Sequence, residues 1–215
     1  LTVYKFINGD NMNKLKTLVI GLVLTISSGI AHAVSVSGNA SLTSDYIWRG
    51  MTQNNGEVSF QGGFDLETDA GFYLGTWTGT AKFDILDEGA IDTGVDDANG
   101  NDIMRDEIID SSTVEVDYYA GYAGSIGDIG YDIGFIEVTY PGASSLDFSE
   151  TYLGLDIMGV GLFYSAGDEF GDYAEISYGF DAGPGSIGLS YGDYEDAGTN
   201  YVIGYDIPVG DFTLS

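Results

Sequence analysis

The sequence predicts an all-β protein, an antiparallel transmembrane β-barrel. Three observations predict this fold: an export signal begins the chain, apolar and polar residues then alternate with a period of two, and the polar half of the alternation is rich in Gly, Ser, Thr and carboxylates. No apolar run after residue 33 is long enough for a transmembrane helix. About eleven strands are visible, and an even count of twelve would complete the barrel.

The export signal occupies residues 1–33. A short basic segment, Met12–Lys16, is followed by apolar residues up to Ile30 and by the small-x-small sequence Ala31-His32-Ala33. This order predicts a signal peptide that starts at Met12 and is cleaved after Ala33. A transmembrane anchor is the alternative, but the apolar run is shorter than the ~20 residues that a spanning helix needs. Residues 34–215 are therefore expected to form the barrel, in the outer membrane of the cell.

The composition excludes several function classes. The formal net charge is -28, and three of the six basic residues lie after residue 33, against all but one of the 34 acidic residues. Such a chain repels phosphate backbones, so we expect no nucleic-acid partner. The chain has no Cys, and its one His lies in the signal peptide. This excludes Ser-His-Asp and Cys-His catalysis and the usual zinc ligands, so we expect no enzyme and no cofactor.

Alternation predicts the strands one after another along the chain. In each run one face is apolar and the other is polar or glycine-rich, as in Val58–Glu67, where Phe60, Phe64 and Leu66 oppose Ser59, Gln61 and Asp65. The runs are 34–42, 58–67, 72–83, 113–122, 129–135, 150–157, 160–165, 174–180, 186–191, 200–207 and a start at Phe212.

The connections between the strands alternate between short and long. Short turns such as Gly127-Asp128 and Met158-Gly159 contrast with one long acidic connection, Asp84 to Ser112. This asymmetry is typical of a barrel with one periplasmic rim and one outer rim. A soluble β-sandwich, secreted, is the alternative architecture, because it also uses alternating antiparallel strands. Two features favour the barrel. The polar face is rich in Gly, Ser, Thr and carboxylates, as expected for a water-filled lumen, and aromatic residues lie near strand ends.

The segment Leu42–Gln53, with the sequence Leu-Thr-Ser-Asp-Tyr-Ile-Trp-Arg-Gly-Met-Thr-Gln, carries a family resemblance. It resembles the opening motif of porins of the TorF type, a family of Gram-negative bacteria whose members are also called conserved hypothetical outer-membrane proteins. Later blocks resemble the family in the same order, at 61–65, 71–77, 115–122 and 140–143. The resemblance covers about residues 34–207 and implies an outer-membrane β-barrel.

Two features depart from the family pattern. The acidic connection at 84–112 is longer than the resemblance leads us to expect. The terminal aromatic strand by which such barrels are recognised for assembly does not follow Phe212. We therefore expect the barrel to be truncated at its C-terminus.

The candidate pore lining is a set of charged residues on the polar strand face. Rings of carboxylates favour cations in a pore, whereas the same residues could also simply hydrate the interior or lie in a plugged barrel. The candidates are nine acids and one basic partner: Asp65, Glu67, Lys82, Glu115, Asp117, Asp132, Glu150, Asp156, Glu175 and Asp206.

Arg49 has two interpretations. It follows Tyr46 and Trp48 at a strand end. It is either a constriction arginine that faces the carboxylates or an interface arginine beside girdle aromatics, paired with a nearby acid. The pair Glu115 and Asp117 could suggest a glycosidase, but two acids on one strand face are far more often plain lumen residues.

The acidic loop 92–102 resembles a calcium loop only in part. Aligning Gly100 with the invariant glycine places Val95, which cannot be a ligand through its side chain, at the first ligand position. We therefore expect no dedicated metal site, and at most weak Ca²⁺ or Mg²⁺ binding across 84–112.

Three hypotheses of function follow. The main one is an outer-membrane β-barrel porin for passive diffusion of small hydrophilic solutes, preferring cations, with outer-membrane lipid around it. The second is a non-conducting barrel with a structural or surface-binding role, whose acidic loops bind divalent cations. The third is the secreted soluble β-sandwich.

Overall fold

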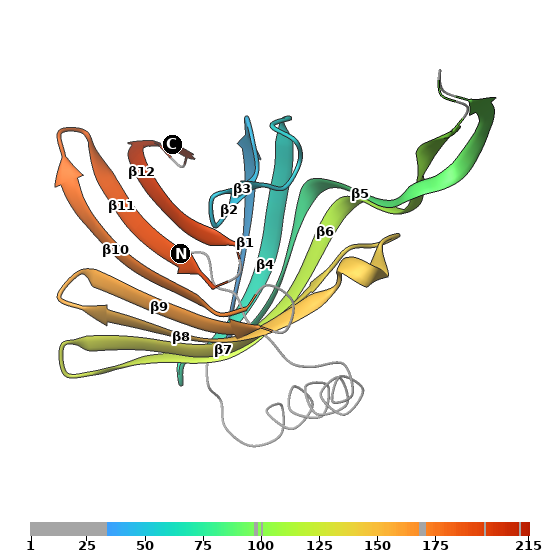
Figure 1. Ribbon diagram of the computed structural model, residues 1–215. Helices are drawn as coiled ribbons and strands as arrows, with labels where there is room; N and C mark the ends of the chain where they lie inside the picture. Colours follow the sequence, from blue (N-terminus) through green and yellow to red (C-terminus); the bar gives the residue numbers. More distant parts are fainter. Residues whose placement is uncertain (1–33, 97–98, 100, 168–170, 196, 211) are drawn as a thin grey trace, which may run out of the picture.

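The computed structural model describes residues 34–96, 99, 101–167, 171–195, 197–210 and 212–215, so the predicted signal peptide lies outside the described residues. Antiparallel β-structure makes up nearly all of the described chain, mostly in one large, strongly curved sheet (Figure 1). Among the described residues, no helix has the length and apolar character needed to cross a membrane.

Eleven strands form the large sheet, and each pairs with its neighbours in sequence. The eleven predicted strands are confirmed. They form a meander, in which alternating runs joined by turns pair one after another. Within the described residues the sheet does not close into a barrel, since β1 and β13 each have a partner on one side only. The strands are β1 Val34–Thr43, β4 Ser59–Thr68, β5 Phe72–Asp96, β6 Asp102–Ile126, β7 Ile129–Thr139, β8 Phe148–Ile157, β9 Val160–Gly167, β10 Tyr173–Ala182, β11 Gly185–Tyr194, β12 Gly198–Val209 and β13 Phe212–Leu214.

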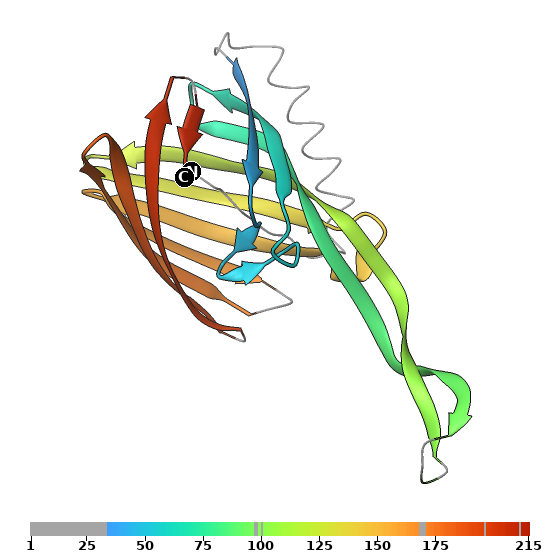
Figure 2. The ribbon, with the colours of Figure 1, turned by 90° about the horizontal axis from the view of Figure 1, so that it is seen from above.

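Three short elements were not predicted. The strands β2 (Ile47–Trp48) and β3 (Met51–Thr52) form a separate hairpin within the connection between β1 and β4, and a 3-10 helix η1 (Ser144–Leu146) lies between β7 and β8. The β2–β3 hairpin lies on the concave side of the large sheet (Figures 1 and 2). We call this side the concave face and the opposite side the convex face.

The convex face is apolar and exposed. Cα pairing places alternate residues of neighbouring strands on the same side, so that Asp65, Gly75, Tyr119, Ile136 and Glu150 share the concave face across five strands. The residues between them point the other way and expose large apolar side chains: Phe64, Phe72, Tyr118, Ile133, Leu153, Leu162, Ile176, Leu189 and Ile203. The distribution of large apolar side chains is thus the reverse of that in a water-soluble protein, which buries them.

The strand β5 departs from the rule that large apolar side chains lie on the convex face. Tyr73, Trp77 and Phe83 point to the concave face, because their register partners and ring contacts lie there, while Lys82 points the opposite way. Lys82 is paired with Glu57, which is not one of the nine predicted acids. Its amino group lies 2.9 Å from Glu57 Oε1, with both side chains exposed.

Tyrosine and glycine pack against each other on the concave face. A Cβ on Gly75 would lie 2.3 Å from the Tyr119 ring, and one on Gly134 would lie 2.3 Å from the Tyr152 hydroxyl. Glycine is required at these places because the rings lie directly over the backbone of the neighbouring strand.

The two rims of the sheet differ. Short turns join the strands at one rim, at 68–72, 126–129, 157–160, 182–185 and 209–212, which we call the short-turn rim. The longer connections, including the one that contains the β2–β3 hairpin, lie at the opposite, long-connection rim. The prediction of a loop over 84–112 is wrong, because β5 and β6 continue as a paired extension with four register shifts that projects from the long-connection rim (Figure 2).

We expect Gly71→Ala to lower the free energy of unfolding by about 2–5 kcal/mol. Gly71 has a φ of 92°, and a Cβ there would lie 2.1 Å from the backbone oxygen of Ala123. Gly127→Ala is the matched control, since Gly127 also has a positive φ, 62°, but no atom within 4 Å of its added Cβ. Urea unfolding of both variants checks the prediction, and equal losses would show that the contact with Ala123 contributes nothing.

Candidate functional site

The connection between β1 and β4 folds onto the concave face. Because Thr43 and Ser59 are Cα partners, residues 44–58 form a long insertion in a hairpin, which we call the inner segment. Its aromatic residues Tyr46 and Trp48 are buried. The backbone of Gln53 donates to Tyr46 O at 2.7 Å and accepts from Lys82 N at 2.8 Å, so the inner segment is fixed both to itself and to β5.

A tight turn at the tip of the inner segment carries Arg49. Only Arg49 and Gly50 separate β2 from β3, and their φ values of 47° and 84° are both in the left-handed region. Two successive positive φ values fit a type I′ hairpin turn. Arginine in this conformation carries backbone strain of about 1–2 kcal/mol, so surrounding contacts must hold it in place.

The Arg49 guanidinium pairs with Glu150 of β8 through both of its terminal nitrogens. Nη1 donates to Glu150 Oε1 at 2.7 Å and Nη2 donates to Oε2 at 2.5 Å. The same nitrogens donate to Tyr194 Oη and to Ser165 Oγ, each at 3.0 Å. The two charged side chains are only 5% and 2% exposed, so this is a buried, bidentate ion pair that links the inner segment to β8, β9 and β11.

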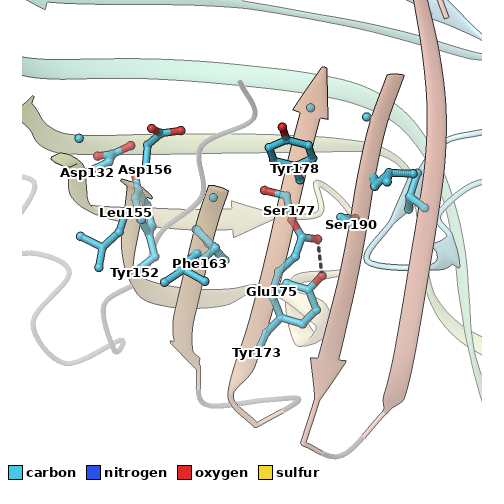
Figure 3. A pocket seen from close by; sticks show the side chains of 18 of the residues that line it. Asp132, Tyr152, Leu155, Asp156, Phe163, Tyr173, Glu175, Ser177, Tyr178 and Ser190 are labelled. Atoms are coloured by element: carbon cyan, nitrogen blue, oxygen red, sulfur yellow. Dashed lines mark hydrogen bonds between the residues drawn. The ribbon is translucent and has the colours of Figure 1, made fainter. Parts of the chain in front are cut away.

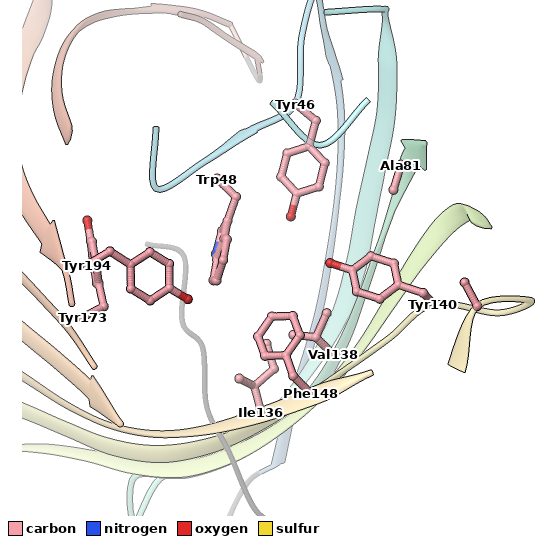
Figure 4. Close-up of a cluster of buried hydrophobic side chains, with 10 residues drawn as sticks. Tyr46, Trp48, Ala81, Ile136, Val138, Tyr140, Phe148, Tyr173 and Tyr194 are labelled. Carbon is pink, nitrogen blue, oxygen red and sulfur yellow. The ribbon is translucent and has the colours of Figure 1, made fainter. Parts of the chain in front are cut away.

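Four aromatic rings surround the same guanidinium. Its Cζ atom lies 4.2 Å from the ring centroids of Trp48 and Tyr173, 5.1 Å from that of Tyr194 and 5.9 Å from that of Phe163. Trp48, Tyr173 and Tyr194 lie together in the buried cluster of Figure 4. We call Trp48, Glu150, Phe163, Tyr173 and Tyr194 the guanidinium cage. Burial opposes the charge on Arg49, but the hydrogen bond and the charge of Glu150 raise the pKa of Arg49 above its usual value.

A second contact holds the inner segment at β6. Tyr46 Oη donates to Glu115 Oε1 at 2.6 Å, and Tyr140 Oη donates to Oε2 of the same carboxylate at 2.7 Å. Asp117, two residues further along β6, is 1% exposed, and neither of its carboxylate oxygens has a hydrogen-bond partner among the described residues. Glu115 and Asp117 are thus covered by aromatic residues rather than open to the concave side.

A cavity of about 800 Å³ adjoins the guanidinium cage on the concave side (Figure 3). Trp48, Arg49 and Tyr173 are among its lining residues, and so are the carboxylates of Asp132, Asp156 and Glu175. Tyr73 Oη donates to Asp132 Oδ1 at 2.6 Å, Tyr173 Oη donates to Glu175 Oε2 at 2.8 Å, and Asp156 Oδ1 accepts from Gly159 N at 3.2 Å. Because Gly159 belongs to the turn between β8 and β9, Asp156 marks the end of the cavity nearest the short-turn rim.

All nine predicted acids lie on the concave face, but the structure does not bring them into one ring. Asp132, Asp156 and Glu175 line the cavity, and Glu150 belongs to the cage. Glu115 and Asp117 lie under the inner segment. Asp65 Oδ1 accepts from Tyr119 at 2.5 Å, while Glu67 and Asp206 lie closer to the short-turn rim, where Asp206 accepts from Ser215 at 2.5 Å.

The structure places Arg49 on the concave face against a carboxylate, not among rim aromatics at the convex surface. The sequence did not indicate the guanidinium cage, because its five members come from five separate segments of the chain. The one local signal was the motif Trp48-Arg49-Gly50, in which an aromatic residue and a cation precede a glycine.

The weak cation site considered at 84–112 lies partly outside the described residues, at 97–98 and 100. In the part of the chain that the structure describes, no group of three or more Asp, Glu, His or Cys residues is arranged to hold a metal ion.

Comparison with known proteins gives one match. Residues 27–211 match a bacterial family described as protein of unknown function (Gcw_chp). No curated protein and no solved structure matches the chain. The family match includes the inner segment, the cage and all of the large sheet except its last strand, and it links the chain to neither TorF nor porins. The chain belongs to the Gcw_chp family of bacterial proteins.

Proposed function

We propose that the protein is an outer-membrane β-barrel that forms a narrow, cation-preferring passage for small hydrophilic solutes, restricted by its inner segment. The observation that carries the proposal is the reversed distribution of polarity. Phe64, Ile133 and Ile203 are 68%, 52% and 78% exposed on the convex face, while the carboxylates lie on the concave face. Lipid is the solvent that would cover such a convex face and leave the concave face wet.

The two rims support the same proposal. Short turns at one rim and long connections at the other are typical of outer-membrane barrels, with the short turns in the periplasm. In that orientation the paired extension of β5 and β6 points out of the cell, and the inner segment enters from the outer side. The sandwich alternative needs two packed sheets, whereas the long strands here belong to one sheet.

Cation preference rests on the charges of the concave face. The nine acids there are accompanied by Arg49, which Glu150 neutralises, so the net charge of the face is strongly negative. A passage with this lining attracts cations and repels anions. The cavity extends from near the short-turn rim to the guanidinium cage, and there the inner segment narrows the proposed passage.

A non-conducting barrel is the second candidate, and the inner segment favours it. Tyr46 and Arg49 hydrogen-bond to β6, β8 and β9, and the inner segment that carries them occupies part of the concave side. In this case the barrel would have a structural or surface-binding role.

Cell fractionation and planar-bilayer recording test the proposal. We expect the complete protein in the outer-membrane fraction and small, cation-selective current steps. Glu175→Gln in the cavity is expected to lower the cation-to-anion permeability ratio, whereas Glu107→Gln, an exposed acid of the β6 extension, leaves the ratio unchanged. Recovery as a soluble periplasmic protein would refute the barrel, and a barrel without current steps would leave the non-conducting candidate.

A further inference from the structure

The guanidinium cage has the chemistry of a receptor for organic cations. A bidentate carboxylate, a hydroxyl from Ser165 and one from Tyr194 accept from the two terminal nitrogens of the guanidinium, and four rings lie around it. This combination of carboxylate and aromatic side chains is how proteins bind guanidinium and ammonium groups. Here the occupant is a side chain of the protein itself.

The occupant is attached under strain. Arg49 reaches the cage from a turn in which its own φ is 47°, a conformation that residues other than Gly, Asn and Asp seldom adopt. A free guanidinium would make the same hydrogen bonds and ring contacts without this backbone conformation. The strained turn therefore disfavours the internal ligand relative to an external one of the same chemistry.

The cavity supplies the route to the cage. It is lined by Arg49 and Tyr173 at the cage and contains Asp132, Asp156 and Glu175 between the cage and the short-turn rim (Figure 3). Its volume of about 800 Å³ is within the range of small-molecule sites. Tyr152 and Phe163, whose ring centroids are 5.6 Å apart, continue the aromatic surface into it. A cation entering here meets three carboxylates and several aromatic faces among the lining residues, whereas an anion is repelled.

We propose that the guanidinium cage and its cavity bind a small organic cation with a guanidinium or ammonium head group, which competes with Arg49 for Glu150 and the rings. The inference deepens the proposed function, on which it rests for the role of the cation as the transported solute. Displacement of Arg49 releases the tip of the inner segment, so that binding of the solute and opening of the passage are one event.

Fluorescence of Trp48 gives a direct test of binding. The chain has two tryptophans, Trp48 in the cage and Trp77 outside it, so Trp77→Phe leaves Trp48 as the only reporter. The complete protein, refolded in detergent, is titrated with methylguanidinium, and methylurea is the neutral control of the same shape. We expect Arg49→Ala to bind methylguanidinium roughly tenfold or more tightly than wild type, because the competing side chain is gone. Neither protein is expected to respond to methylurea.

Two further variants assign the binding to the cage. Adding Glu150→Gln to Arg49→Ala is expected to weaken methylguanidinium binding by roughly tenfold or more, because the bidentate carboxylate is lost. Arg105→Ala removes an exposed arginine of the β6 extension and is expected to bind as wild type does. Equal affinity of Arg49→Ala, Arg105→Ala and wild type, or an equal response to methylurea, would overturn the proposal.

A milder variant covers the case in which Arg49→Ala does not fold. Arg49→Lys keeps a cation in the cage but loses the second hydrogen bond to Glu150, so methylguanidinium should displace it more readily than it displaces Arg49. No gain in affinity for this variant would also count against the proposal. Because binding is measured in micelles, it is independent of the membrane assays. Binding without current steps refutes only the transport function, and current steps without binding refute only the cage as a cation site.

Discussion

Glu150→Ala is expected to lower the free energy of unfolding by about 3–5 kcal/mol, because it leaves the Arg49 guanidinium buried without a counter-charge. The Arg49 and Glu150 side chains are 5% and 2% exposed, so water cannot replace the lost carboxylate without a rearrangement of the inner segment. Unfolding of the refolded protein in urea measures the loss. Guanidinium chloride is unsuitable because its cation would compete for the cage.

Glu57→Ala is the matched control for this prediction. Glu57 also pairs with a basic residue, Lys82, at 2.9 Å, but the two side chains are 64% and 45% exposed. Exposed ion pairs contribute little because water and salt screen them, so the change is expected to lie within the error of the measurement. Similar losses for both variants would show that the Arg49–Glu150 pair has no special weight in the fold.

The double variant Arg49→Ala/Glu150→Ala separates the pair from the packing around it. If the buried, unpaired charge causes the loss in Glu150→Ala, then removing Arg49 as well should recover part of the stability. Losses that simply add would instead indicate that each side chain acts through its own packing, and the ion pair would then not be what holds the inner segment.

The sequence predicted the strands well because alternation defines both their extent and their faces. A shift of one residue in the pairing of two strands would turn every apolar side chain of one strand to the opposite face. The alternating pattern therefore determines the register. This is why all nine acids share one face even though they come from six different strands. The reasoning failed on β5, where Tyr73 and Trp77 fill the concave side by lying over glycine and against other aromatic rings. Residue type alone does not distinguish an aromatic residue facing lipid from one that fills an interior.

The inner segment and the cage could not be predicted from local sequence. Tyr46, Trp48 and Arg49 read as the aromatic end of a strand, and arginine is not a residue that signals a turn with positive φ. What fixes this turn is tertiary: Glu150, Ser165 and Tyr194 lie between 101 and 145 residues away along the chain. The extension at 84–112 was missed for a related reason. Its strands pair with four register shifts, which destroy the period of two on which the prediction rests.

On the proposed function, replacing residues 44–58 with Asn-Gly is expected to raise the single-channel conductance by on the order of tenfold, because it removes the inner segment from the concave side. Thr43 and Ser59 are already Cα partners, so a two-residue type I′ turn can join β1 and β4 directly without a change of register. Glu115 and Glu150 lose their hydrogen bonds from Tyr46 and Arg49 in this variant but keep those from Tyr140 and Tyr194. Both carboxylates face the space that the inner segment occupied and can be hydrated there. Planar-bilayer recording checks the prediction, and selectivity for cations should persist because the nine acids remain.

A matched control for that replacement exists at the opposite rim. Gly127-Asp128 already joins β6 to β7 as a two-residue turn between the partners Ile126 and Ile129, so its replacement with Asn-Gly changes a turn without touching the concave face. Conductance of this control should equal that of wild type. Arg49→Ala should give an intermediate increase, since it frees only the tip of the inner segment while Tyr46 and Gln53 still hold its base. If the shortened protein inserts into bilayers but conducts no better than wild type, the tyrosines that lie over Gly75 and Gly134 close the interior on their own, and the barrel is then the non-conducting kind.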